Sequence, residues 1–201
     1  MRPVLNLRLQ VLLEPHADYE KLISEAVLGG VTCVQYRDKI SSDRDFHEKA
    51  LEIQDICRRN RVPLIINDRI HIALAIEAQG VHLGQSDLLF DVARRLLPDH
   101  MSIGLSAECQ EDVRQANKLD LDYLAISPVF STPTKLNTAE PFGLEGLRKA
   151  REISRHRLVA IGGVNASNVF AIREAGAEGI AVVSAICRAK SPREAAKGLI
   201  L

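Results

Sequence analysis

The sequence lacks a net charge, because its 26 Lys and Arg residues balance its 26 Asp and Glu residues. A protein without a basic surplus has no overall field that attracts nucleic acid or an anionic membrane. We therefore expect neither of these partners. An anionic ligand must be bound by groups that the fold brings together locally.

Paired cysteines and histidine metal motifs are also missing. The four cysteines lie far apart without a CxxC pair, and the six histidines show no HxxxH or HExxH spacing. This pattern favours single buried thiols in a reduced compartment over disulfides or a zinc site. The cysteines are Cys33, Cys57, Cys109 and Cys187.

Long apolar runs are absent as well. No stretch approaches the roughly 18 apolar residues of a membrane helix. The N-terminal stretch "MRPVLNLRLQVLLEP" is interrupted by Asn6, Arg8 and Gln10, which is atypical of a signal peptide. We expect a cytoplasmic protein.

Short apolar, β-branched runs are present, and each is followed by a longer segment of helical periodicity. Strands are predicted at 7–13, 32–37, 63–67, 80–84, 102–106, 123–127, 158–162 and 179–183. Helices are predicted, for example, at 19–28, 43–59, 69–78, 88–97, 111–118, 144–154, 166–175 and 192–200. Eight such units predict a single α/β domain over 1–201, a (β/α)8 TIM barrel near its lower size limit. The alternative, an open doubly wound sheet, lacks its GxGxxG signature.

Catalytic residues of such barrels gather at the carboxyl ends of the strands. The stretch "NDRIHIALAIEAQGVHLGQSD" (67–87) places Asp68 and Asp87 after two neighbouring strands. Each aspartate precedes a helical pattern, so helix capping is one interpretation. The second is a shared metal site, and the two roles are compatible.

The strand ending in "VQYRDK" (34–39) carries polar residues at alternate positions. Gln35, Arg37 and Lys39 share one face and Tyr36 lies on the other, because side chains alternate along a strand. Polar groups facing the barrel interior need a polar or anionic partner. One alternative is that Arg37 pairs with a carboxylate of the barrel.

A phosphate site is predicted after the last two strands. Gly162 and Gly163 let an anion approach the main chain, and Val183 and Ser184 follow the eighth strand. A tight turn explains the glycines equally well. The longest loop, 128–143, is either a lid or an irregular surface segment.

Two aspartates beside several cations fit Mg2+ bound to a polyphosphate, because magnesium takes one or two carboxylates, waters and phosphate oxygens. With these residues at the ends of its predicted strands, the chain resembles the thiamine-phosphate synthase (thiamine-phosphate pyrophosphorylase) family. The resemblance covers roughly 31–187 and rests on "VQYRDK", "LIINDR", "GVHLGQSD", "IGLSA", "PVFSTPTK", "GLEGL", "VAIGGV" and "GIAVVSAI". The family joins an aminopyrimidine-methyl diphosphate to a thiazole phosphate and releases pyrophosphate.

The resemblance implies a role for each matching residue. Asp68 and Asp87 would carry Mg2+. The pyrimidine diphosphate would be held by Gln35, Arg37, Lys39, Asn67, Ser106 and Lys135, of which Arg37, Lys39, Ser106 and Lys135 would act in catalysis. The thiazole phosphate would be held by Thr132, Thr134, Gly162, Gly163, Val183 and Ser184. We expect small phosphorylated molecules as partners and leave open a homo-oligomer.

The chain departs from the family pattern at three places. Its first strand reads "QVLLE" instead of a sequence ending in Thr-Asp, Tyr36 replaces a common leucine, and Ser127 replaces a glycine. Tyr36 is expected to face the helices, and Ser127 is expected at the pyrimidine pocket.

Three rival functions stay open at this point. They are a thiazole tautomerase, a Schiff-base aldolase using Lys39 or Lys135, and a paralogue that binds a thiamine intermediate without turnover. The sequence indicates no apolar pocket that would lower the pKa of either lysine, which disfavours the aldolase.

Overall fold

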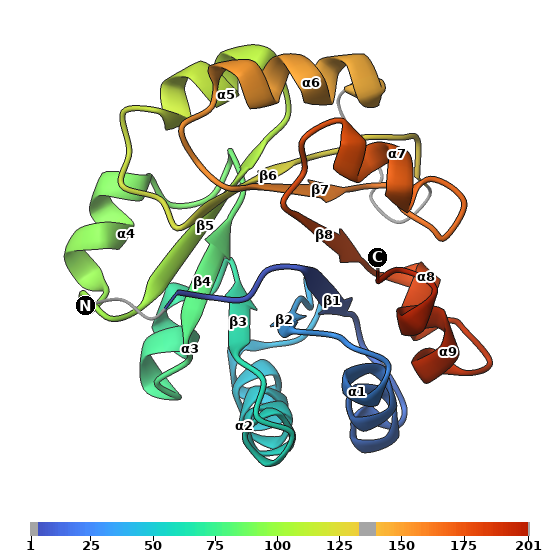
Figure 1. Ribbon diagram of the computed structural model, residues 1–201. Helices are drawn as coiled ribbons and strands as arrows, with labels where there is room; N and C mark the ends of the chain where they lie inside the picture. Colours follow the sequence, from blue (N-terminus) through green and yellow to red (C-terminus); the bar gives the residue numbers. More distant parts are fainter. Residues whose placement is uncertain (1–3, 133–139, 201) are drawn as a thin grey trace.

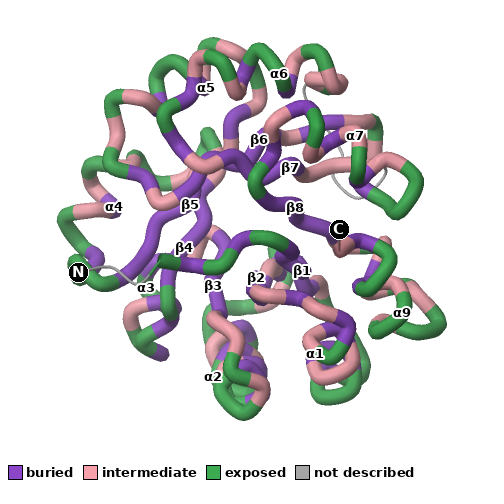
Figure 2. Tube along the Cα trace, in the orientation of Figure 1, coloured by how far each residue is buried: buried purple, intermediate pink, exposed green. Residues whose placement is uncertain are grey.

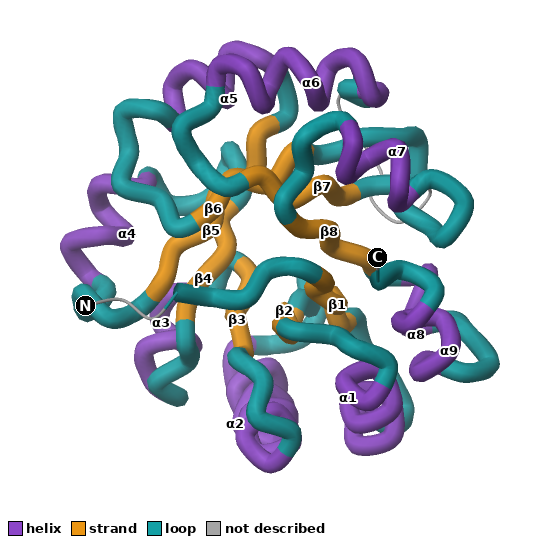
Figure 3. The backbone as a smooth tube through the Cα atoms, viewed as in Figure 1, coloured by secondary structure: helices purple, strands orange, loops and turns teal. Residues whose placement is uncertain are grey.

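The computed structural model describes residues 4–132 and 140–200 of the chain. Its strands pair in parallel in chain order and close into a barrel through β1 and β8, with the helices around the outside (Figure 1). The tube coloured by secondary structure shows the same inner ring of strands and outer ring of helices (Figure 3). The predicted (β/α)8 barrel is confirmed.

The strands are short and buried along almost their whole length (Figure 2). Parallel strands covered on both faces require this continuous burial. Their bounds are β1 (Leu9–Leu13), β2 (Cys33–Tyr36), β3 (Leu64–Asn67), β4 (Gly80–Leu83), β5 (Ser102–Ala107), β6 (Tyr123–Ile126), β7 (Leu158–Ile161) and β8 (Gly179–Val182).

The helices cover the barrel, and several begin at side-chain caps. The carboxylate of Asp18 accepts a hydrogen bond from the main-chain N–H of Lys21, and the hydroxyl of Ser42 accepts one from Asp45. Helix bounds are α1 (Tyr19–Leu28), α2 (Asp43–Arg59), α3 (Ile70–Ala75), α4 (Phe90–Leu96), α5 (Gln110–Ala116), α6 (Gly143–Ile153), α7 (Val169–Glu174), α8 (Ser184–Cys187) and α9 (Pro192–Lys197). Among the described residues, no helix has the length and apolar composition needed to cross a membrane.

Several helices are shorter than predicted. The segment predicted as helix over 69–78 is helical only in α3, because the chain turns back at Glu77 (φ 53°) to enter β4 at Gly80. Likewise, α4 begins only at Phe90 and α7 only at Val169. The short α8 was not predicted, because its apolar residues follow the eighth strand without a break.

The core has two parts. A large cluster lies between the strands and the helices, and there Tyr36 packs against the rings of Tyr19 and Phe46, with centroid distances of 6.1 and 4.4 Å. Tyr36 therefore faces the helices as predicted. A smaller apolar cluster fills the barrel interior and comprises Leu5, Leu7, Leu12, Cys33, Ile65, Tyr123, Ala125, Val159 and Ala181.

Gly104 on β5 makes room for the Tyr123 ring on the neighbouring strand. A Cβ atom at Gly104 would lie 2.1 Å from Cζ of Tyr123. We expect Gly104→Ala to lower the free energy of unfolding by about 1–3 kcal/mol, because the added methyl group overlaps the buried ring and forces it out of its packed position. Urea denaturation measures the change.

The matched control is Gly198→Ala, where the nearest atom to the added Cβ is 3.6 Å away. This variant should stay within about 0.5 kcal/mol of the parent. Equal stabilities of the two variants would show that the close approach at Gly104 is unimportant.

Candidate active site

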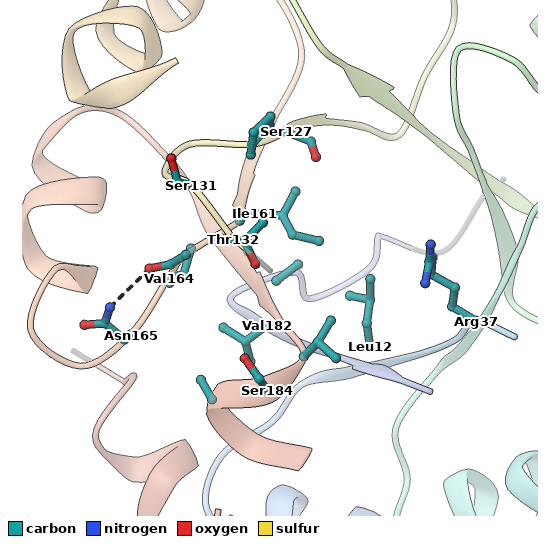
Figure 4. Close-up of a pocket in the computed structure, with 16 residues that line it drawn as sticks. Leu12, Arg37, Ser127, Ser131, Thr132, Ile161, Val164, Asn165, Val182 and Ser184 are labelled. Atoms are coloured by element: carbon teal, nitrogen blue, oxygen red, sulfur yellow. Dashed lines mark hydrogen bonds between the residues drawn. The ribbon is translucent and has the colours of Figure 1, made fainter. Parts of the chain in front are cut away.

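Two neighbouring cavities open at the carboxyl end of the barrel. The first, here called the carboxylate cavity, has a volume of about 210 Å³ and contains Asp68 and Asp87. The second, called the glycine cavity, has a volume of about 320 Å³ and contains Gly162 and Gly163 (Figure 4). The two cavities share part of their walls, which is formed by Leu12, Arg37, Ser127, Ile161 and Ala181. Two ligands bound in them would therefore be in contact range.

The carboxylate cavity collects residues from several strand ends. Every predicted diphosphate or metal residue that the structure describes lines it: Gln35, Arg37, Lys39, Asn67, Asp68, Asp87 and Ser106. The alternation along β2 thus directs Gln35, Arg37 and Lys39 to one cavity, as predicted. Lys135 and Thr134 lie outside the described residues.

Asp68 and Asp87 interact directly. Burial raises the pKa of Asp68 to about 6, and a hydrogen bond to Asp87 adds to the increase, against the opposing contact with Lys39. Burial also acts to raise the pKa of Asp87, but hydrogen bonds from the Asp68 carboxyl and the Gly84 N–H hold it below the usual range. Below about pH 6, the protonated Asp68 carboxyl therefore shares its proton with Asp87 through a hydrogen bond.

Neither aspartate caps a helix. The N-cap positions of α3 and α4 are Arg69 and Leu89, and neither makes a side-chain cap hydrogen bond. Asp68 adopts a left-handed conformation (φ 62°), and Oδ2 of Asp87 accepts the N–H of Gly84 at 2.6 Å. The capping interpretation is therefore wrong, because each helix starts later than the aspartate before it.

Arg37 has a carboxylate partner, as the structural alternative predicted. Its Nη1 lies 3.3 Å from Oε1 of Glu14, which follows β1. Both side chains remain about a quarter exposed, at 23% and 29%. Because Arg37 also lines both cavities, this pair holds the guanidinium at their shared wall.

Six further polar residues of this cavity were not among the predicted site residues, namely Gln10, His82, Gln85, Ser86, Glu108 and Tyr123. The ring nitrogens of His82 lie 3.0 Å from the Tyr123 hydroxyl and 2.9 Å from the Ser106 hydroxyl. Gln10 is buried in β1. A polar residue at an inward position of an apolar strand is the signal that identifies Gln10 and His82.

The glycine cavity collects the predicted phosphate residues. Thr132, Gly162, Gly163, Val183 and Ser184 all line it. Gly162 (φ 96°) and Gly163 (φ 66°) have left-handed conformations that disfavour other residues. The side chain of Asn165 donates to the carbonyl of Gly163 at 3.1 Å (Figure 4). The side chain of Asn168 donates to the same carbonyl at 2.9 Å, and the two bonds fix the turn.

In the described part of the chain, the side chains that could bind a metal ion together form only small groups. No group of three or more His, Cys, Asp or Glu side chains is suitably placed there. The Asp68–Asp87 pair nevertheless fits a magnesium ion that completes its shell with water and substrate phosphate oxygens. It does not fit zinc, which prefers nitrogen and sulfur ligands in closed sites.

Ser127, one of the departures from the family pattern, lines both cavities. Ser127 therefore forms part of the wall where two ligands would meet. The peptide bond between Ser127 and Pro128 is cis.

Comparisons with known proteins show the family to which the chain is similar. A sequence model described as thiamine monophosphate synthase matches residues 9–186. The thiamine-phosphate synthase of Albidiferax ferrireducens is 52% identical over 175 residues, covering 87% of this chain and 80% of that protein. The enzyme of the same name from Vibrio campbellii is 45% identical over 184 residues, covering 92% and 90%. The structure of thiamine phosphate pyrophosphorylase from Pyrococcus furiosus has a TM-score of 0.87 at 35% identity and covers 96% and 93%.

The raised pKa of Asp68 predicts a pH-dependent stability. Its proton stabilises the folded protein at acidic pH, and this contribution is lost as the pH rises through about 6. In EDTA, Asp68→Asn should therefore increase the free energy of unfolding more at pH 8 than at pH 5, by on the order of 1 kcal/mol. Urea denaturation at both pH values measures this difference.

Ser86→Ala is the control, because it changes a neighbouring residue of the same cavity without altering a carboxyl group. Its effect should be the same at both pH values. An Asp68→Asn effect that is also independent of pH would contradict the shared proton.

Proposed function

We propose that this chain, which belongs to the thiamine monophosphate synthase family, condenses 4-amino-2-methyl-5-pyrimidinylmethyl diphosphate with a thiazole phosphate. The second substrate is 4-methyl-5-(2-phosphoethyl)thiazole or its carboxylated form, and the products are thiamine phosphate and pyrophosphate. The carboxylated form would also lose its carboxylate as carbon dioxide. The observation that carries the proposal is the pair of cavities with a shared wall at Arg37 and Ser127. One cavity suits a diphosphate with its cation and the other suits a single phosphate.

The carboxylate cavity would bind the pyrimidine diphosphate. Arg37 and Lys39 supply positive charge from the segment that follows β2, and Asn67 and Ser106 supply polar groups from β3 and β5. Lys135 would add a third cation. Asp68 and Asp87 would hold Mg2+, which when bound supplies Lewis-acid stabilisation of the leaving pyrophosphate.

The glycine cavity would bind the thiazole phosphate. The backbone at Gly162, Gly163 and Ser184 can approach a phosphate closely, and the Thr132 side chain lines the same space. Thr134 would extend this set. Binding of the phosphate in this cavity would orient the thiazole ring toward the shared wall, so that binding energy contributes to the placement of the reacting nitrogen.

The residues present suit a dissociative reaction. Departure of pyrophosphate leaves a pyrimidinylmethyl cation, and the thiazole nitrogen then attacks that carbon with an unprotonated lone pair. The bond-forming step therefore needs no general base. In agreement, both ring nitrogens of His82 lie against hydroxyl groups, those of Tyr123 and Ser106. The protein would have two tasks. Arg37 and Lys39 would stabilise the negative charge of the leaving pyrophosphate, and the two cavities would place the reactants next to each other.

The direct test is thiamine phosphate formation by the purified protein with both substrates and Mg2+. We expect product and pyrophosphate in equal amounts, with no reaction when either substrate is omitted or EDTA is added. Saturable binding of the thiazole phosphate without condensation would contradict the proposal. It would favour a tautomerase-like enzyme or a binding paralogue instead.

Removal of one metal-site carboxylate should abolish most turnover. We expect Asp87→Asn to lower kcat by about 100- to 1000-fold, the effect commonly seen when one group that stabilises developing charge is lost. Steady-state pyrophosphate release measures the change, and circular dichroism checks the fold. Asp91→Asn, on the exposed surface of α4, is the control and should retain parental activity. Near-normal turnover of Asp87→Asn would disprove the metal assignment.

The glycine cavity can be tested separately. A Cβ at Gly163 would lie 2.7 Å from Cβ of Phe130 and 3.0 Å from the carbonyl of Ser131, and its φ is left-handed. We expect Gly163→Ala to raise KM for the thiazole phosphate at least about tenfold while KM for the pyrimidine diphosphate stays within about twofold. Equal increases in both constants would contradict a separate phosphate site.

A further inference from the structure

Gly104 allows two polar rings to meet inside the barrel. In the strand register Gly104 on β5 lies between His82 on β4 and Tyr123 on β6, and it has no side chain to separate them. The two rings stack, with centroids 5.5 Å apart and an interplanar angle of 22°. Their residues are only 7% and 1% exposed, so the packing around them fixes both orientations.

Hydrogen bonds connect these rings to the carboxylate cavity. The Tyr123 hydroxyl lies 3.0 Å from Nδ1 of His82, and Nε2 of His82 lies 2.9 Å from the hydroxyl of Ser106. Ser106 follows Gly104 by two positions on β5, about 7 Å closer to the barrel mouth, and it lines the cavity. The contacts of His82 therefore decide how the Ser106 hydroxyl is oriented toward a ligand.

Two buried glutamines set the direction of these hydrogen bonds. Nε2 of Gln35 donates to Oε1 of Gln10 at 3.4 Å, and the Gln10 amide donates to the Tyr123 oxygen. The proton of Tyr123 is thereby directed to Nδ1 of His82. A ring nitrogen that accepts carries no proton, so the proton of the His82 ring is on Nε2 and is donated to the oxygen of Ser106.

The Ser106 oxygen accepts a hydrogen bond from His82 and keeps its own O–H group for the cavity. A diphosphate presents only acceptor oxygens, so a serine that donates stabilises it, whereas a serine whose lone pairs face it repels it. In the reverse direction, the Ser106 proton would be donated to His82 and lost to the ligand. A diphosphate in the cavity therefore favours the same direction that the two glutamines set.

We propose that His82 is a positioning residue, which holds the Ser106 hydroxyl as a hydrogen-bond donor toward the diphosphate. This inference rests on the proposed function, because it deepens the role of Ser106 in that site. His82 acts through Ser106, and Tyr123 fixes which nitrogen of the His82 ring carries the proton.

The first test is NMR of the ring nitrogens of His82 in the parent protein with Mg2+ and pyrophosphate bound. We expect a proton on Nε2 and none on Nδ1. The spectrum of His82→Gln, which lacks this ring, assigns the signals. A proton on Nδ1 would overturn the inference, because Tyr123 could then not donate to that nitrogen. The result does not depend on how well a variant folds.

The second test is a double-mutant cycle in which calorimetric titration gives the Kd of pyrophosphate with Mg2+. His82→Phe keeps a ring beside Tyr123 and removes both nitrogens. We expect about tenfold weaker binding than to the parent, because the Ser106 hydroxyl is no longer held as a donor. In a Ser106→Ala background, the same change at His82 should alter Kd by less than about twofold.

Two further variants complete this test. His82→Gln retains an N–H group that can donate to Ser106, so its Kd should stay within about threefold of the parent. His156→Phe is the matched control, because His156 is similarly buried at 8% and its Nε2 lies 2.8 Å from the carbonyl of Ala116, between α6 and β7. This variant should bind pyrophosphate as the parent does.

Two outcomes of the cycle would overturn the inference. One is an unchanged Kd for His82→Phe. The other is an equal loss with and without the Ser106 hydroxyl, which would indicate a structural role or a direct effect of the imidazole on the anion.

Both tests use pyrophosphate, so they do not depend on turnover. A parent that binds pyrophosphate but makes no thiamine phosphate would refute the proposed function and leave the role of His82 to these two measurements. A parent that does not bind pyrophosphate would overturn both.

Discussion

Hydrogen bonds between β1 and β8 close the barrel, with Leu9 opposite Ile180 and Val11 opposite Val182. This closure brings the beginning and the end of the chain into one wall. Leu12 and Arg37 thereby line the same cavities as Ile161 and Ala181, although they lie far apart in sequence. An open sheet would leave β1 and β8 at opposite edges, and the shared wall between the two cavities would not exist.

The barrel interior changes from apolar to polar along its axis. The inner cluster around Leu7, Ile65 and Val159 fills one part, whereas carboxyl, amide and cationic groups gather at the carboxyl ends of the strands. The polar end carries unfavourable features, namely adjacent carboxyl groups at Asp68 and Asp87 and an amide oxygen of Gln35 that has no hydrogen-bond partner among the described residues. Locally unfavourable features of this kind cluster at functional sites, because a bound ligand supplies the missing interactions.

Sequence periodicity predicted the features that depend on local geometry. The alternation along β2 correctly separated Arg37 and Lys39 from Tyr36, because a strand has a fixed period of two. Periodicity failed to predict helix boundaries that depend on the path of the chain between neighbouring elements. The helix after Asp68 starts at Ile70 and ends at Ala75 because the chain must enter β4, so the capping interpretation of Asp68 was wrong. Gln10 was interpreted only as a break in an apolar stretch, although a polar residue within an apolar strand is a signal for a position that faces a cavity.

The central claim is that two anionic ligands bind at the same time in adjacent cavities. Calorimetric titration of the thiazole phosphate into protein saturated with pyrophosphate and Mg2+ tests it most directly. The account predicts one thiazole phosphate bound per chain, with a Kd within about threefold of that measured without pyrophosphate. Competition, in which saturating pyrophosphate abolishes binding of the thiazole phosphate, would contradict the account.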